Sequence, residues 1–118
     1  MAIPLTPEIL AAAYSYLQTT PPYCNWGLPD SEDVKFLVVN HPGDHGRYTC
    51  SGRGKKRIHY ISISRGTVAH TSTLMATMAH EMVHVYQCIT GQRSTHAIAF
   101  GHFAQMVCDV HGFDPKAF

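Results

Sequence analysis

The spacing of the apolar residues changes near residue 70, and this change constrains the fold more than any other feature of the sequence. Before it, the segment 58–64 alternates, with His59, Ile61 and Ile63 on one face, as in a half-buried strand. From about Thr71 onward, apolar residues recur at steps of three and four, which is the period of a helix with one buried face: Leu74, Met75, Met78, Met82, Val85 and Ile89. We therefore predict a strand followed by a long helix, with Gly91 at its C-terminal cap.

Local signals predict the other elements. Thr6 is a helix cap and Pro7 the first residue of a helix that ends before Pro21-Pro22. The segments 34–39 and 47–50 are strand candidates, and short connections favour a small three-stranded antiparallel sheet with 58–64. A last helix is capped by Ser94 or Thr95, ends at Gly112, and carries an apolar seam of Phe100, Phe103, Val107 and Val110. The order helix, three strands, helix, helix is an α+β fold.

Length and charge limit the classes of protein. The 118 residues fit one domain, 1–118, and the net charge of +1 gives no bulk attraction to nucleic acid or to an anionic membrane. No apolar run reaches the roughly 20 residues of a membrane span. The N-terminus has no secretory signal pattern, so we expect a cytoplasmic protein. There the four cysteines, which form no C-x-x-C motif, are expected to be free thiols, with a disulfide pair as the alternative.

The predicted long helix contains His80-Glu81-Met82-Val83-His84, the H-E-x-x-H pattern. Residues four apart lie one turn apart on one helix face, so both imidazoles can reach one cation, and Zn²⁺ fits neutral imidazole ligands. Glu81 lies about 100° around the helix, where it can hold a water molecule without binding the metal. The alternative interpretation is two surface histidines on a packed helix.

A catalytic zinc site needs a third protein ligand. Gln87 and Thr90 stand where a metzincin has glycine and histidine, and no glutamate follows Glu81, as a gluzincin requires. The remaining candidates are His96, His102, His111, Asp109 and Asp114. His96 is favoured because it lies four residues before Phe100 and extends the apolar seam at the start of the last helix. His102 leaves that face, and His111 lies over about 20 Å away along the helix axis.

The segment from Leu74 to Tyr86 resembles the active-site helix of SprT-like zinc metalloproteases, the group that includes Spartan. The resemblance extends over about 58–115: a strand before the helix, a third histidine four residues before a Phe, and Gly112 after the last helix. Ala97 replaces the glycine that usually follows the third histidine. The zinc ribbon or DNA-binding tail of many members has no counterpart here, so a stand-alone catalytic domain is expected.

This resemblance implies a zincin that hydrolyses peptide bonds in a protein or peptide substrate. His80, His84 and His96 would hold Zn²⁺, and Glu81 would act as general base. The strand 58–64 is expected to accept the substrate as an added strand. Four residues are candidates for the donor that stabilises the oxyanion: Tyr60, His70, Tyr86 and His102.

Two other interpretations stay open. The zinc could belong to a non-catalytic scaffold that binds a protein or nucleic acid; an intact Glu81 favours the enzyme, since a scaffold needs no general base. The basic residues of a predicted hairpin tip are expected to be solvated, with a weak nucleic-acid contact as the alternative: Arg53, Lys55, Lys56 and Arg57. A second metal site is a minor alternative to solvated loop histidines, with His41, His45, Cys50 and Cys24 as ligands.

Overall fold

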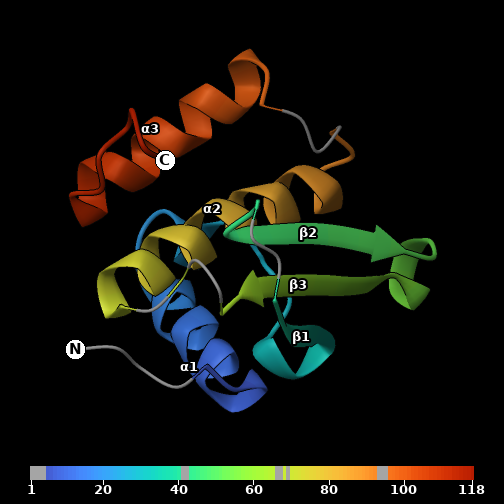
Figure 1. Ribbon diagram of the computed structural model, residues 1–118. Helices are drawn as coiled ribbons and strands as arrows, with labels where there is room; N and C mark the ends of the chain where they lie inside the picture. Colours follow the sequence, from blue (N-terminus) through green and yellow to red (C-terminus); the bar gives the residue numbers. More distant parts are fainter. Residues whose placement is uncertain (1–4, 41–42, 66–67, 69, 93–95) are drawn as a thin grey trace.

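The structure is a computed structural model that describes residues 5–40, 43–65, 68, 70–92 and 96–118 (Figure 1). Within these ranges, three α-helices and a three-stranded sheet follow in the order α1 (Pro7–Gln18), β1 (Val34–Val39), β2 (Gly46–Ser51), β3 (Ile58–Ser64), α2 (Thr71–Ile89) and α3 (Ile98–His111). Single 3₁₀ turns occupy Tyr23–Asn25, Ser31–Asp33 and Gly54–Lys56. The predicted α+β class is confirmed.

The ends of the helices follow local chemistry at three of the predicted positions. The hydroxyl of Thr6 accepts a hydrogen bond from the backbone N–H of Ile9 at 3.2 Å, and Pro7 occupies the first turn. Gly112 ends α3 at φ +77°, a left-handed conformation that favours glycine. The start of α3 differs from the prediction: its cap residue is Ala97, which makes no side-chain cap bond, and Ser94 and Thr95 lie outside the described residues.

The sheet is mixed, so the prediction of an all-antiparallel sheet is wrong. Strand β3 lies in the centre, antiparallel to β2 and parallel to β1, in the order β1-β3-β2. The β2–β3 hairpin has the predicted orientation, but β1 pairs with the opposite edge of β3. Strand β3 contains two fully buried isoleucines, Ile61 and Ile63, and its central position in the sheet gives their side chains the greatest burial.

A connection of six residues, 40–45, lets β1 and β2 lie on opposite sides of β3. It has to span two strand spacings, about 10 Å, which is well within its reach. Two hydrogen bonds anchor both ends of this connection to the end of β3: Ser64 N–H donates to the carbonyl of His45 at 2.8 Å, and Arg65 N–H donates to that of Val39 at 2.9 Å. Short connections therefore did not require β1 and β2 to be neighbours.

Helix α2 contacts α1, α3, β2 and β3, and lies between the sheet and α3 in Figure 1. The predicted stripe of α2 is buried at Leu74, Met78, Met82 and Val85. Helix α3 packs against α2, with Phe100 and Val107 buried, whereas the predicted seam residue Val110 is exposed. In the last turn of α3, His111 faces the protein instead, with Nε2 2.9 Å from the hydroxyl of Thr20. No helix within the described ranges is long and apolar enough to cross a membrane.

Two aromatic hydroxyls hold the first part of the chain in place. The hydroxyl of Tyr23 donates to the carbonyl of Ala79 on α2 at 2.6 Å, and Tyr14 donates to the carbonyl of Pro29 at 2.6 Å. Both tyrosines are fully buried. Because a buried hydroxyl without a partner is costly, the Tyr23 bond fixes the loop after α1 against the helix that carries the H-E-x-x-H pattern, and the Tyr14 bond fixes α1 to the end of that loop.

Gly46, the first residue of β2, lies unusually close to α2. A Cβ atom at this position would lie 2.9 Å from Cγ2 of Thr77 and 3.1 Å from Cδ1 of Ile63. The absence of a side chain at residue 46 therefore allows β2 to approach the first half of α2.

We predict that Gly46→Ala lowers the free energy of unfolding by about 1–3 kcal/mol, because the added methyl group overpacks the contact between β2 and α2. Urea denaturation measures the change. The matched control is Gly101→Ala on the exposed face of α3, where a Cβ atom meets nothing within 4 Å. That substitution should stabilise the protein by about 0.5–1 kcal/mol through helix propensity. Equal effects of the two substitutions would contradict the close approach.

Candidate metal centre

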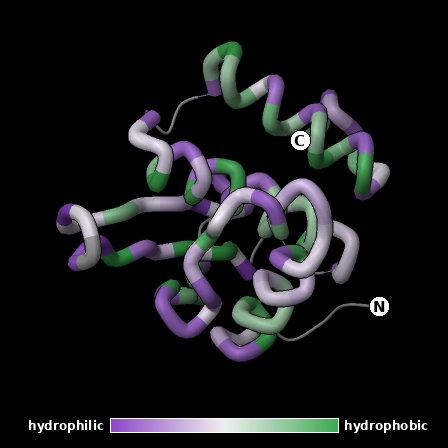
Figure 2. The backbone as a smooth tube through the Cα atoms, turned by 180° about the vertical axis from the view of Figure 1, so that it is seen from behind, coloured by the Kyte–Doolittle hydropathy of each residue, from purple (hydrophilic) through white to green (hydrophobic). Residues whose placement is uncertain are grey.

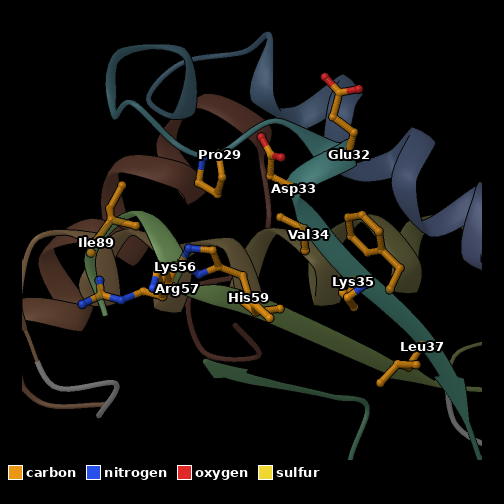
Figure 3. Close-up of a pocket in the computed structure, with 13 residues that line it drawn as sticks. Pro29, Glu32, Asp33, Val34, Lys35, Leu37, Lys56, Arg57, His59 and Ile89 are labelled. Carbon is orange, nitrogen blue, oxygen red and sulfur yellow. The ribbon is translucent and has the colours of Figure 1, made fainter. Parts of the chain in front are cut away.

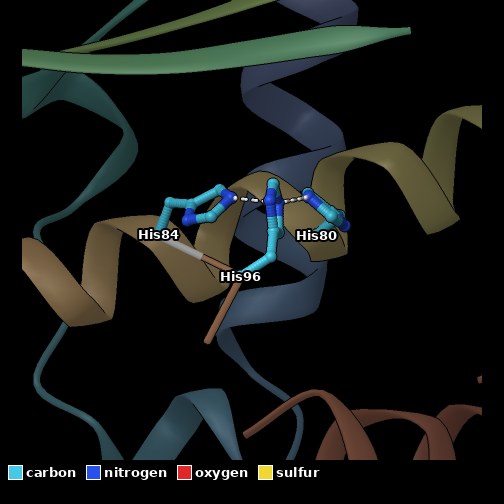
Figure 4. A group of neighbouring side chains, drawn as sticks. All are labelled: His80, His84 and His96. Carbon is cyan, nitrogen blue, oxygen red and sulfur yellow. Dashed lines mark hydrogen bonds between the residues drawn. The ribbon is translucent and has the colours of Figure 1, made fainter. Parts of the chain in front are cut away.

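Three histidines converge at the surface of α2 (Figure 4). His80 and His84 lie one turn apart on α2, and the Nε2 atom of each lies 3.1 Å from Nε2 of His96. The three ligand atoms lie within 4.8 Å of one another, and within the described part of the chain no other group of three such residues is placed to hold a metal ion. The favoured prediction for the third residue is thereby consistent with the geometry, and this group could hold a metal ion.

The other ring nitrogens of two of these histidines have acceptor partners. Nδ1 of His80 lies 2.6 Å from the carbonyl oxygen of Phe118, and Nδ1 of His84 lies 2.7 Å from Oε1 of Gln87. Oxygen acceptors require a proton on Nδ1, so in the neutral rings both Nε2 atoms present lone pairs. Nε2 of His96 carries at most one proton and cannot satisfy both lone pairs with linear hydrogen bonds. A cation between the three nitrogens satisfies all of them, so the donor set fits a metal ion.

The ring of Phe100 supports the three imidazoles from the side of α3. Its centroid lies 4.9 Å from that of His80, 5.0 Å from that of His84 and 4.8 Å from that of His96. Phe100 is buried, whereas His96 is exposed and precedes the first residue of α3 by two positions. The sequence analysis placed His96 on the last helix, and this is wrong: His96 reaches the cluster from the chain before α3.

Burial sets the protonation of the residues on α2. It lowers the pKa of His80 to about 4, against a smaller opposing effect of the hydrogen bond to Phe118, and it also lowers the pKa of His84. Both rings are therefore neutral near pH 7, as metal binding requires. Burial, with a contribution from the charge of Asp44, raises the pKa of Glu81 to about 7. A cation bound nearby would favour the carboxylate form of Glu81.

A cavity of about 590 Å³ opens beside the cluster. His80, Glu81 and His96 line it, and Glu81 is only 5% exposed. One further wall is the start of β2 with the loop before it, 43–46, and another is formed by residues of the C-terminal segment 113–118. The cavity therefore gives a small part of an extended molecule access to the glutamate and to two of the histidines.

The cavity is lined by polar residues other than the predicted oxyanion donors. Tyr60, His70, Tyr86 and His102 do not line it; the ring of Tyr86 instead stacks on Trp26 with centroids 4.1 Å apart. Besides the cluster and Glu81, the cavity is lined by the acidic residues Asp44 and Asp114. Its other polar residues are His45, Ser72, Thr73 and Thr77. A sequence signal for two of these exists, since Thr73, Thr77 and Glu81 are spaced by four and share one face of α2. The contact of Phe118 with His80 has no local signal.

The other sites considered from the sequence are not assembled among the described residues. His45 lines the cavity, Cys50 lies against Cys88, and Cys24 is exposed on another turn; the described residues thus form no second metal site, and His41 lies outside them.

Hydrophilic residues gather at the tip of the β2–β3 hairpin, where the basic run lies (Figure 2). In that run the guanidinium of Arg57 donates to the carbonyl of Cys88 at 2.9 Å, and the side chain of Lys55 is outside the described part. A nucleic-acid contact stays a prediction.

A larger groove, of about 1160 Å³, lies along β1 and the start of β3 (Figure 3). Charged residues of both signs line it, among them Glu32, Asp33, Lys56 and Arg57. Its acidic residues and His59 form no group of three that could hold a metal ion within the described residues. The smaller cavity beside the three histidines is therefore the candidate functional site.

Comparison of the chain with protein-family models, with curated proteins and with solved structures finds no match. The residues and geometry of the site are therefore the basis for inferring a function.

We predict that the protein binds one equivalent of zinc and that His96→Ala lowers the affinity by at least about 100-fold, since it removes one of three ligands. Competition with a chromophoric chelator measures the affinity. His102→Ala is the matched control, because His102 is an exposed histidine of α3 that does not line the cavity; its affinity should equal that of the wild type. Equal losses in the two variants would exclude His96 as a ligand.

Gln87 offers a test of the hydrogen bond that orients His84. Gln87→Met keeps an unbranched side chain but removes the acceptor for Nδ1 of His84, so the affinity for zinc should fall about 10–100-fold. Gln87→Glu retains an acceptor oxygen and should bind zinc more tightly than Gln87→Met. If both variants bind zinc as the wild type does, the contact with His84 has no role in metal binding.

Proposed function

We propose that this protein is a zinc-dependent peptidase with the site arrangement of SprT-like metalloproteases. His80, His84 and His96 would hold Zn²⁺, and Glu81 would act as the general base. The observation that carries the proposal is the convergence of three Nε2 atoms beside a cavity that a buried glutamate also lines. Each part alone has a structural explanation, but the combination matches the needs of metal-assisted hydrolysis.

Zinc is the proposed ion because of the type and number of the ligands. Three imidazoles leave a fourth tetrahedral position for water or substrate, which distinguishes catalytic zinc sites from closed structural ones. A bound zinc ion supplies Lewis acidity, which makes water a nucleophile at neutral pH and polarises a peptide carbonyl. The hydrogen bonds to Phe118 and Gln87 would keep His80 and His84 oriented with Nε2 toward that ion.

Glu81 would move the proton during the reaction. It follows the first ligand directly in the chain and lines the same cavity, so its carboxylate can accept a proton from the attacking water and deliver it to the leaving amine. Its burial suits this role, because a carboxyl group whose pKa is raised to about 7 can both accept and donate a proton near neutral pH. Thr77 and His45, on two walls of the cavity, are the nearest candidates for contacts with the substrate carbonyl.

An extended peptide would be bound along β2. The earlier expectation for β3 is wrong, because β3 pairs with a strand on each side. Strand β2 is an edge strand of the described sheet, and its first residue lines the cavity. In an antiparallel pair, every second residue directs its N–H and C=O groups toward the partner strand. His45 is bonded to Ser64 in this way, so the residues whose main-chain groups point away from β3 are Gly46, Tyr48 and Cys50. A peptide paired with this edge would pass the glutamate and the histidine cluster.

We predict that Glu81→Gln retains bound zinc but loses at least about 10²–10⁴-fold in the rate of peptide hydrolysis, because the amide cannot accept the proton. The measurement is cleavage of casein, or of the protein itself, followed by gel electrophoresis with the zinc-loaded protein. A metal chelator should abolish cleavage by the wild type.

Glu32→Gln is the matched control, because Glu32 is an exposed glutamate outside the cavity and its loss should leave the rate unchanged. Hydrolysis by Glu81→Gln at the wild-type rate would contradict the proposal. Stoichiometric zinc in a wild type that cleaves no peptide would instead favour the non-catalytic scaffold.

A further inference from the structure

Two cysteines face each other across the contact between β2 and α2. Cys50 lies on β2 and Cys88 on the last turn of α2, and their Sγ atoms are 2.8 Å apart although no bond joins them. This separation is shorter than a van der Waals contact of two sulfur atoms and longer than the disulfide bond of about 2.05 Å. The two sulfur atoms are therefore within reach of each other.

We propose that Cys50 and Cys88 are a redox modification site, at which an intramolecular disulfide links β2 to α2. With a peroxide as oxidant, the thiolate of Cys50 attacks one peroxide oxygen, which gives a sulfenic acid and releases water. The thiolate of Cys88 then attacks Sγ of Cys50, and the hydroxyl group leaves as a second water. The two sulfurs lose two electrons and two protons, and one hydrogen peroxide is reduced to two water molecules.

Accessibility assigns the order of the two steps. Cys50 is exposed, whereas Cys88 is half-buried, so an oxidant from solvent meets Cys50 first and Cys88 resolves the sulfenic acid. The guanidinium of Arg57 lies close enough to both cysteines to act on the charge of Cys50 and to donate to the carbonyl of Cys88 at 2.9 Å. Burial raises the pKa of the Cys50 thiol, as does its hydrogen bond with Cys88, and the positive charge of Arg57 opposes this rise.

The surrounding contacts hold both sides of the pair in place. Arg57, the residue before β3, ties the hairpin to the end of α2 through the carbonyl of Cys88. On the same side of the hairpin, the hydroxyl of Tyr48 lies 2.6 Å from Nδ1 of His59, and both residues are buried. Formation of the bond requires the two sulfur atoms to approach each other by less than about 1 Å.

The disulfide would fix β2 along the length of α2. Gly46 already approaches Thr77 at one end of the strand, and Cys50 meets Cys88 at the other. The bond would close a loop between residues 38 positions apart, which restricts the unfolded chain and stabilises the folded protein. It would also hold the edge of β2 against the helix that carries His80 and His84. The disulfide itself depends on neither zinc nor peptidase activity.

The test is oxidation of the folded, full-length protein with a small excess of hydrogen peroxide, followed by alkylation of the remaining thiols and intact mass measurement. We expect two of the four thiols to escape alkylation. The measured mass should be two hydrogens below that calculated for the reduced chain with two alkyl groups, and digestion should yield a peptide in which Cys50 is bonded to Cys88. The melting temperature should rise by on the order of 10 °C and return to the starting value with reductant.

The remaining cysteines give matched controls. Cys24→Ser replaces another exposed cysteine and should form the same disulfide as the wild type, whereas Cys50→Ser should form none. In Cys88→Ser, a sulfenic-acid probe should label Cys50. The proposal is overturned if all four thiols persist after oxidation, if the bond involves Cys24 or Cys108, or if it joins two copies of the chain. These measurements involve no hydrolysis, so their failure leaves the proposed peptidase function untouched.

Discussion

The position of α2 at the centre of the molecule is the constraint on which the other features depend. Its apolar stripe must be buried against α1 and the sheet, while one strip of its surface stays polar and faces a cavity. The stripe includes Met78, Met82 and Val85. The polar strip includes His80 and Glu81, which line the cavity, and His84 one turn after His80. Because burial of the stripe fixes the rotation of the helix, it also fixes where the two imidazoles and the carboxylate point. The packing of the core thus determines the geometry of the candidate site.

This arrangement places polar side chains at positions that apolar residues would stabilise better. Thr77, Glu81, His84 and Gln87 are all buried on α2. Buried polar groups cost free energy unless partners satisfy them, and the raised pKa of Glu81 reflects that cost. Gln87 and His84 satisfy each other in part through one hydrogen bond. A helix selected only for stability would not carry this strip, and the proposed metal binding and hydrolysis would give it a physical purpose.

The parts of the fold that local chemistry determines could be predicted from the sequence. The cap at Thr6, the end of α3 at Gly112 and the periodic stripe of α2 each depend on residues within a few positions of one another. The pairing of the strands depends on contacts distant in sequence, and the short connections did not show that β3 would lie between β1 and β2. The exposure of Val110 likewise depends on a distant contact, that of His111 with Thr20, which turns the last turn of α3 and which no local pattern encodes.

The candidate site shows the same division between local and distant contacts. The spacing of His80 and His84 is a helical property, so it was visible in the sequence. The hydrogen bond between Gln87 and His84 joins residues only three apart on the same helix, but the sequence analysis did not predict it. The contact of Phe118 with His80 joins residues 38 positions apart and left no signal.

His96 is the instructive case, because the prediction named the favoured residue but placed it on the wrong element. The seam of α3 was extended back from Phe100 by one helical turn, whereas Ala97 is extended and the helix begins only at Ile98. His96 nevertheless reaches the cluster because Phe100 packs against all three imidazoles and brings the preceding chain with it. The anchor is therefore the aromatic contact between α3 and α2, and not the helical phase of His96.

A metal ion held by these three residues would bridge two segments whose other contact is the packing of α3 on α2. Two of its ligands belong to α2, and the third lies in the chain that leads into α3. Because an ion that binds only the folded state stabilises it, zinc would strengthen the docking of α3 as well as supply chemistry. The cavity wall formed by residues 113–118 follows α3 directly, so the same ion would help to hold that wall in place. Metal binding and the shape of the cavity are thus coupled through one helix.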